Sequence, residues 1–278
     1  MISLYHQTCN ECSKLVTNRY STSFSLGIRV FAKQFRLPIY AIYGYVRFAD
    51  EIVDTFHGYD KAALLSDFRA ETWKAIADGV SMNPILHSFQ AVVRQYGIER
   101  ELIEAFLDSM EMDLHNNVYQ KELYEKYIYG SAEVVGLMCL RVFCEGDSEK
   151  FDSLKESARS LGAAFQKVNF LRDLGSDFDE RGRVYFPGVD FNNFSPEDKK
   201  LIEDDIMKDF RHAYEGIVQL PAGARLGVYL AYVYYLDLFR KIRKTAAEKV
   251  RQQRIRVPNS RKFYLLATSA MRMSLNML

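Results

Sequence analysis

The sequence has few helix-breaking residues, few cysteines and little net charge. Its 278 residues include 6 prolines and 15 glycines, which favours long helices. A net charge of +1 argues against nucleic acid as the partner. Four cysteines in a chain of this length do not indicate a disulfide framework. No run of 18 apolar residues is present, so we expect no transmembrane anchor and a cytoplasmic location.

Amphipathic stretches with a helical period cover most of the chain. We predict that one helix spans 36–57, with Pro38 in its first turn and Gly58 at its end. No strand alternation, internal repeat or glycine-rich phosphate loop stands out. The sequence therefore predicts an all-α fold in a single domain, 1–278, around a central cavity. The other predicted helices span 3–18, 60–79, 84–96, 99–116, 150–175, 196–218 and 221–247.

One stretch carries four polar residues at helical spacing. Tyr43, Arg47, Asp50 and Asp54 lie at positions 0, +4, +7 and +11, so a helix places them on one face. Their neighbours include apolar residues, and burying an unpaired carboxylate there is costly. A single Asp-x-x-x-Asp pair also fits a solvated helix face or surface ion pairs.

A second stretch repeats this pattern far downstream. Gln166, Asn169, Asp173 and Asp177 lie at positions 0, +3, +7 and +11, and Arg172 directly precedes the first aspartate. Carboxylate oxygens suit Mg²⁺, whose coordination is usually completed by substrate phosphates and water. Two facing helices of this kind predict a site for an organic diphosphate held by Mg²⁺, with Mn²⁺ as an alternative ion.

These two stretches resemble motifs of the squalene and phytoene synthase family. Its first motif, Y-x-x-x-R-x-x-D-D/E-x-x-D, is matched by residues 43–54, with Glu51 at the usual second aspartate. Its second motif, N-x-x-R-D-x-x-x-D followed by R-G-R-x-Y-x-P, is matched by 169–177 and 181–187. The resemblance covers nearly the whole chain. It implies an isoprenoid-synthase-type helical bundle around an apolar cavity.

The resemblance also implies the residues of the site. The implied metal ligands are Asp50, Asp54, Asn169, Asp173 and Asp177. Catalytic roles fall to the four aspartates together with Tyr43 and Arg47. The implied substrate-binding residues are Ser21, Ser23, Phe24, Tyr43, Arg47, Gln166, Asn169, Arg172, Arg181, Arg183 and Tyr235.

Three segments leave alternatives open. The hydroxyl-rich stretch 20–25 can cap a helix or contact diphosphate, and its Tyr20 replaces the histidine of many relatives. The loop 176–187 fits a lid over diphosphate or an ordinary surface loop. Residues 127–136 resemble the family's Y-x-Y-x-V-A-G-x-V-G, but Ser131 and Glu133 replace its first valine and its first glycine.

The implied activity is that of a prenyltransferase. We predict a phytoene synthase of carotenoid biosynthesis, which condenses two geranylgeranyl diphosphates head to head through a cyclopropylcarbinyl diphosphate. A C15 enzyme that makes dehydrosqualene, hydroxysqualene or squalene from farnesyl diphosphate is the close alternative. More distant alternatives are a class I terpene cyclase and a non-catalytic helical scaffold. The 37 aromatic Phe and Tyr side chains can line a tunnel and stabilise carbocations, although helix packing explains most of them.

The final part of the sequence adds a hypothesis about membranes. Residues 251–261 are strongly basic and precede an amphipathic stretch, 263–278. This pairing predicts weak peripheral association with the anionic inner surface of a membrane. Nothing in the sequence indicates an obligate protein partner.

Overall fold

The computed structural model describes residues 2–115, 120–181, 185–189, 194–252 and 254–275, without the side chains of 176–181, 251 and 259. Within these residues the chain is helical and contains no strand, which confirms the all-α prediction. The helices are α1 (Ile2–Tyr20), α2 (Thr22–Arg29), α3 (Lys33–Asp54), α4 (Lys61–Asp78), α5 (Pro84–Tyr96), α6 (Arg100–His115), α7 (Lys121–Ile128), the π-helix η1 (Tyr129–Glu133), α8 (Val134–Cys144), α9 (Ser148–Arg181), α10 (Pro196–Ile217), α11 (Ala222–Arg243), α12 (Ala247–Gln252) and α13 (Asn259–Ser274).

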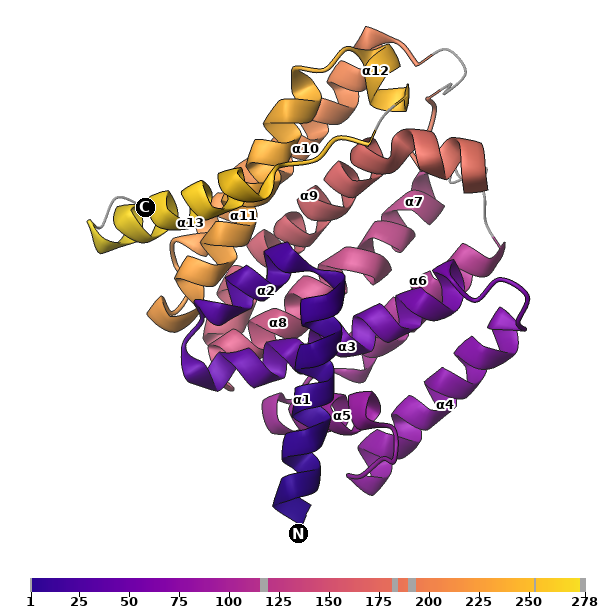
Figure 1. The fold of residues 1–278 in the computed structure, drawn as a ribbon, viewed down its shortest axis with the longest axis vertical. Coiled ribbons are helices and arrows are strands. Elements are labelled where there is room, and N and C mark those ends of the chain that lie inside the picture. Colours follow the sequence, from indigo (N-terminus) through magenta and orange to yellow (C-terminus); the bar gives the residue numbers. More distant parts are fainter. Residues whose placement is uncertain (1, 116–119, 182–184, 190–193, 253, 276–278) are drawn as a thin grey trace.

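The helices form two groups, which η1, α8 and α9 connect. In Figure 1, α1 and α3–α6 make up the lower part of the molecule, and α10–α13 the upper part. Helix α9 packs most extensively against α10 and α8, while α3 packs against α1, α5 and α8. Each group has its own cluster of buried apolar side chains.

Local sequence signals explain where several helices begin and end. The Asn83 side chain accepts hydrogen bonds from the first backbone N–H groups of α5, and Gly97 ends that helix at a positive φ of 64°. Ser195 and Asp198 form a reciprocal capping box at the start of α10. Caps of this kind explain why the predicted bounds of these helices are close to the observed ones.

Helix α3 departs from its prediction at both ends. It begins at Lys33, so Pro38 lies in its second turn rather than its first. It ends at Asp54 with Thr55 as its C-cap, and Gly58 follows in the loop with φ of 91°. Burial explains the early start, because Phe35 is 1% exposed and draws the first turn into the core.

Helix α9 is longer than predicted. It continues through Gly175 to Arg181, so the predicted loop 176–187 is wrong for its first six residues. A glycine inside a helix costs about 1 kcal/mol. The packing of α9 against α8 and α10 offsets that cost. Asp177 and Arg181 therefore lie on the same helix as Asp173.

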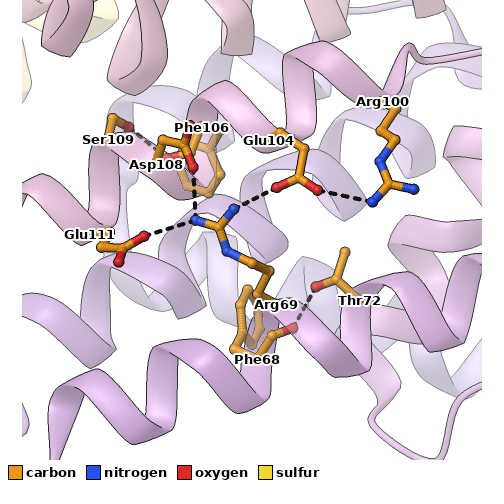
Figure 2. Close-up of polar contacts among 9 residues, drawn as sticks. All are labelled: Phe68, Arg69, Thr72, Arg100, Glu104, Phe106, Asp108, Ser109 and Glu111. Atoms are coloured by element: carbon orange, nitrogen blue, oxygen red, sulfur yellow. Dashed lines mark hydrogen bonds and ion pairs between the residues drawn. The ribbon is translucent and has the colours of Figure 1, made fainter.

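An ion-pair cluster joins α4 to α6 on the outside of the fold. Figure 2 shows the Arg69 guanidinium between three acidic side chains of α6. Arg69 lies 2.5 Å from Glu104, 2.9 Å from Asp108 and 3.3 Å from Glu111. Asp108 and Glu111 are largely exposed, and exposed ion pairs add little to stability. The cluster therefore mainly orients α6 relative to α4.

One helical stretch among the described residues is long and apolar enough to cross a membrane. It is Lys121–Cys144, which comprises α7, η1 and α8. Core helices of soluble proteins can have the same length and composition. In this fold, 56% of the most apolar part of Lys121–Cys144 is buried. The expectation of no membrane anchor stays a prediction.

Candidate active site

A cavity of about 660 Å³ runs between α3 and α9, and seven further helices contribute to its walls. On α9 the lining residues extend from Leu154 to Asp173, 19 positions and therefore about 28 Å along the helix axis. The α9 stripe is apolar or small up to Phe165, and from Gln166 onward it is polar except for Phe170. On α3 the lining likewise changes from isoleucine and tyrosine to arginine and aspartate. One end of the cavity is thus acidic and the other apolar.

The acidic end combines side chains from both motif helices. We use the name acidic end for the part of the cavity that is lined by Arg47, Asp50, Asp54, Asp113, Arg172, Asp173 and Arg254. Tyr43, Gln166 and Asn169 line the cavity beside them. The structure therefore brings together most of the side chains that the two motifs predict. Spacing placed each set on one face, and packing of α3 and α9 around one cavity brings the faces together.

Arginine side chains compensate the carboxylates. On α3, Arg47 forms an ion pair with Glu51 and lies 3.8 Å from Asp50. On α9, Arg172 pairs with Asp173, with Nε 3.0 Å from Oδ1. Both arginines are about three-quarters buried, so these pairs are partly shielded from water.

Arg254 was missed by sequence reasoning. Its Nε lies 2.8 Å from Oδ1 of Asp173, and it lines the acidic end. It follows α12 and belongs to the basic stretch that the sequence assigned to membrane association. The only available signal was its positive charge, which the other three basic residues of 251–261 share.

Aromatic side chains line the cavity beside the acidic end. The ring of Tyr235 stacks on Phe165 with centroids 3.9 Å apart, and its hydroxyl donates to Asn169 Oδ1 at 3.4 Å. Phe24 lies 5.6 Å from Tyr43 and 6.3 Å from Tyr235, measured between ring centroids. Burial raises the pKa of Tyr235 to about 12, so it remains a neutral donor at physiological pH.

The environment of Asp50 disfavours the charged form of its carboxyl group. Burial raises the pKa of its carboxyl to about 7, and the nearby carboxylates of Asp54 and Asp113 act in the same direction. Arg47 opposes this shift without cancelling it. The acidic end therefore holds more negative charge than its arginines neutralise, which is a property of sites that accept cations.

The donors present at the acidic end suit Mg²⁺. Its carboxylates and the Asn169 amide offer hard oxygen ligands, as this ion requires. Among the described side chains, no three His, Cys, Asp or Glu residues come close enough to hold an ion by themselves. Oxygen atoms of a bound diphosphate would complete the coordination.

Several predicted site residues lie elsewhere or outside the description. Ser21 caps α2 by accepting from the Phe24 N–H at 3.2 Å, and it hydrogen-bonds the Tyr43 hydroxyl. Ser23 lines a small adjacent hollow, not the cavity. The side chains of Asp177 and Arg181, and all of Arg183, lie outside the described residues.

Three residues that depart from the family motifs, Tyr20, Ser131 and Glu133, make different contacts in the structure. The Arg47 guanidinium lies 4.4 Å above the Tyr20 ring, a cation–π contact. Ser131 lines the cavity, and its buried Oγ has no hydrogen-bond partner within the described part of the chain. Glu133 instead turns to Arg159 on α9, with Oε2 2.6 Å from Nε.

Small residues let η1 pack closely between α6 and α9. A Cβ on Gly130 would lie 2.3 Å from the Ala105 carbonyl oxygen, and one on Gly162 would lie 2.6 Å from the Ala132 carbonyl oxygen. Both positions therefore require glycine. The π-helix carries Ser131 and Ala132 to the cavity wall.

Sequence comparison finds the same family over most of the chain. The family described as Squalene/phytoene synthase matches residues 17–261. A phytoene synthase of Arthrospira platensis is 26% identical over 287 aligned residues, covering 94% of this chain and 92% of the relative. A 4,4'-diapophytoene synthase of Staphylococcus haemolyticus is 27% identical and covers 73% of this chain and 70% of that protein.

Solved structures of similar fold agree with this comparison. A crystal structure of a dehydrosqualene synthase in complex with ligand has a TM-score of 0.81 at 20% identity, covering 97% of this chain and 98% of the other. Squalene synthase HpnC from Alicyclobacillus acidocaldarius has a TM-score of 0.76 at 19% identity, covering 87% and 95%. At these identities the likeness establishes the fold.

Proposed function

This chain belongs to the squalene/phytoene synthase family and is a prenyltransferase, and from that premise we propose that it joins two geranylgeranyl diphosphates head to head to give phytoene. The observation that carries the proposal is the cavity itself. One end offers carboxylates and arginines for diphosphate, and the other continues along α9 as an apolar channel for a prenyl chain. The proposed place in metabolism is carotenoid biosynthesis.

Asp50, Asp54, Asn169, Asp173 and Asp177 would hold Mg²⁺. The bound ion would neutralise the diphosphate oxygens as negative charge develops on them. The chain's own cations act on the same group, because Arg47, Arg172 and Arg254 line the acidic end. Their guanidinium groups bind and orient the leaving diphosphate.

The reaction needs an allylic cation that survives until the second substrate attacks. When the C–O bond of one substrate breaks, its electron pair leaves with the diphosphate. The double bond of the second substrate then attacks the cation, a proton is lost, and a cyclopropylcarbinyl diphosphate forms. The rings of Tyr43, Phe165 and Tyr235 line the cavity, where aromatic groups can stabilise positive charge. The apolar walls exclude water that would otherwise capture the cation.

The second step starts from the cyclopropylcarbinyl diphosphate. Its C–O bond breaks, the carbon skeleton rearranges, and loss of a proton gives the hydrocarbon. The Tyr235 hydroxyl donates to Asn169 and is held neutral by burial, so it positions Asn169 without adding charge. The same arginines receive the second diphosphate.

The C20 substrate is favoured by the breadth of the match and by the lining of the apolar end. The phytoene synthase of Arthrospira platensis aligns over 94% of this chain, against 73% for the diapophytoene synthase. The lining of the cavity continues along α9 for about 28 Å, from Asp173 to Leu154, which suits a long chain. Farnesyl diphosphate is the second candidate, since a dehydrosqualene synthase superimposes over 97% of the chain.

Product analysis tests this proposal. Purified protein with Mg²⁺ is incubated with geranylgeranyl and farnesyl diphosphate in separate tubes, and extracted hydrocarbons are identified by mass. A C40 hydrocarbon from the C20 substrate supports the proposal. A C30 product from farnesyl diphosphate alone transfers the assignment to the C15 enzymes. No hydrocarbon from either substrate, with folded protein, rejects both.

A further inference from the structure

Helices α2 and α11 pack closely together at one wall of the cavity. Each contributes a glycine to this crossing, Gly27 on α2 and Gly227 on α11, and both glycines line the cavity. A Cβ on Gly227 would lie 2.7 Å from the Gly27 carbonyl oxygen. It would also lie 2.2 Å from Cε1 and 2.5 Å from Cδ1 of the Phe31 ring. Position 227 therefore has room for a hydrogen atom and not for a methyl group.

The Phe31 ring lies directly over Gly227 and forms part of the cavity wall. Phe31 is 6% exposed and lines the cavity. Its ring also packs against Phe143 of α8, with centroids 5.1 Å apart. Phe143 is in turn in edge contact with Phe35, with centroids 5.5 Å apart. The position of the Phe31 ring is thus set by α11 and by a row of aromatic rings.

Three hydrogen bonds hold the backbone around Phe31 in place. Its N–H donates to the Ile28 carbonyl at 3.2 Å, and its carbonyl accepts from Arg36 Nε at 2.8 Å. The next N–H, of Ala32, donates to the Gly223 carbonyl at 2.8 Å and ties this stretch to α11. A methyl group on α11 under the ring would therefore be accommodated by rotation of the Phe31 side chain rather than by movement of its backbone. Because the ring borders the cavity, the cavity is the space that it would enter.

This contact lies well inside the cavity. Gly227 precedes Tyr235 by eight residues, which is about 12 Å along α11. Tyr235 contacts Asn169 beside the acidic end, and Ala231 lines the cavity between Tyr235 and Gly227. A prenyl chain that starts at the acidic end thus passes Phe31 only with the part that is far from its diphosphate.

We propose that Gly227 sets the length of prenyl chain that the cavity accepts, by leaving space for the Phe31 ring outside the path of the chain. Gly227 is a positioning residue, because it acts through Phe31. This inference rests on the proposed function, since it takes the ligand to be a prenyl diphosphate whose chain lies in the cavity. A methyl group at this position should shorten the channel, so the loss of affinity should grow with the length of the chain.

Calorimetric titration measures this without turnover. The full chain with Mg²⁺ is titrated with thiodiphosphate analogues that carry C10, C15 and C20 prenyl chains. Gly227→Ala should weaken binding of the C20 analogue at least about tenfold, and binding of the C10 analogue by no more than about twofold. The matched control is Gly27→Ala, whose Cβ would lie 3.5 Å from the Gly227 carbonyl oxygen, an ordinary contact. Equal dependence on chain length in the two variants overturns the proposal.

A second substitution tests whether the effect passes through Phe31. Adding Phe31→Leu to Gly227→Ala makes room for the methyl group, so the loss of C20 affinity should shrink to about threefold or less. A double variant as weak as Gly227→Ala alone would show that the methyl group acts by another route, which overturns the proposal. Phe31→Ala crowds nothing and should strengthen binding of a C25 analogue relative to C20 at least about fivefold. An unchanged ratio would show that Phe31 does not bound the channel.

The same titrations separate this inference from the proposed function. If the unchanged protein binds none of the analogues, the proposed function and the inference fail together. If it binds the C20 analogue and Gly227→Ala keeps the same preference for chain length, only the inference fails.

Discussion

The two ends of the cavity differ in what holds them in place. At the acidic end, seven ionisable side chains share a small space, and burial with neighbouring charge raises the pKa of Asp50 to about 7. At the apolar end, side chains from several parts of the chain pack without charge, such as Phe31 against Phe143 with centroids 5.1 Å apart. The acidic end is therefore arranged for a ligand at the expense of stability, while the apolar end belongs to the core. Substitutions should affect the two ends in different ways.

The largest effect is expected at the acidic end. Asp173→Asn should lower turnover about 10²- to 10³-fold, because it removes a charged ligand aimed at the diphosphate. Hydrocarbon formation with Mg²⁺ measures this. Asp108→Asn is the control, since Asp108 lies in the Arg69 cluster outside the cavity and should retain normal turnover. An Asp173→Asn protein with normal turnover would contradict the assignment.

Arg254 should have the next largest effect. Arg254→Gln removes a cation that pairs with Asp173, so KM for the diphosphate should rise about tenfold with a smaller change in kcat. Arg256→Gln, two residues further along and exposed, should leave KM unchanged in detergent-free solution without vesicles. Equal KM values for the two variants would place Arg254 outside the substrate-binding residues.

At the apolar end, substitution should change selectivity more than rate. Cys139 lines the cavity on α8, and Cys139→Phe would fill part of the channel. The ratio of C20 to C15 turnover should then fall about tenfold, whereas Cys139→Ala should keep or raise it. Competition between the two diphosphates, read by product mass, measures the ratio. A Cys139→Phe enzyme with an unchanged ratio would show that the prenyl chain lies elsewhere.

The smallest effect concerns stability and pH. The pKa of Asp50 is higher in the folded state than its ordinary value of 3.8, so its contribution to stability is present at low pH and lost as pH rises toward about 7. Asp50→Asn should therefore raise the free energy of unfolding at pH 8 by about 1 kcal/mol, a figure reduced because the side chain is 34% exposed. At pH 4 the variant should match the unchanged protein. Denaturant unfolding at both pH values measures this, and a variant less stable at pH 8 would contradict it.

The sequence predicted the acidic end far better than the apolar end. Tyr43 to Asp54 and Gln166 to Asp173 were found from spacing alone, because a helix converts spacing into a shared face. The cavity wall at Cys139 and Leu220 was not found, since these residues come together only through packing of distant helices. The ends of α3 and α9 were predicted wrongly for a related reason. Tertiary packing, rather than Gly58 or Gly175, decides where those helices end.

The measurement that tests the account most directly is a crystal structure with Mg²⁺ and geranylgeranyl thiodiphosphate, an analogue whose C–S bond resists cleavage. The account predicts the diphosphate group between α3 and α9, in contact with Asp50, Asp173 and Arg254, and the prenyl chain along α9 toward Leu154. A diphosphate bound away from these residues, or a chain outside the cavity, would contradict it.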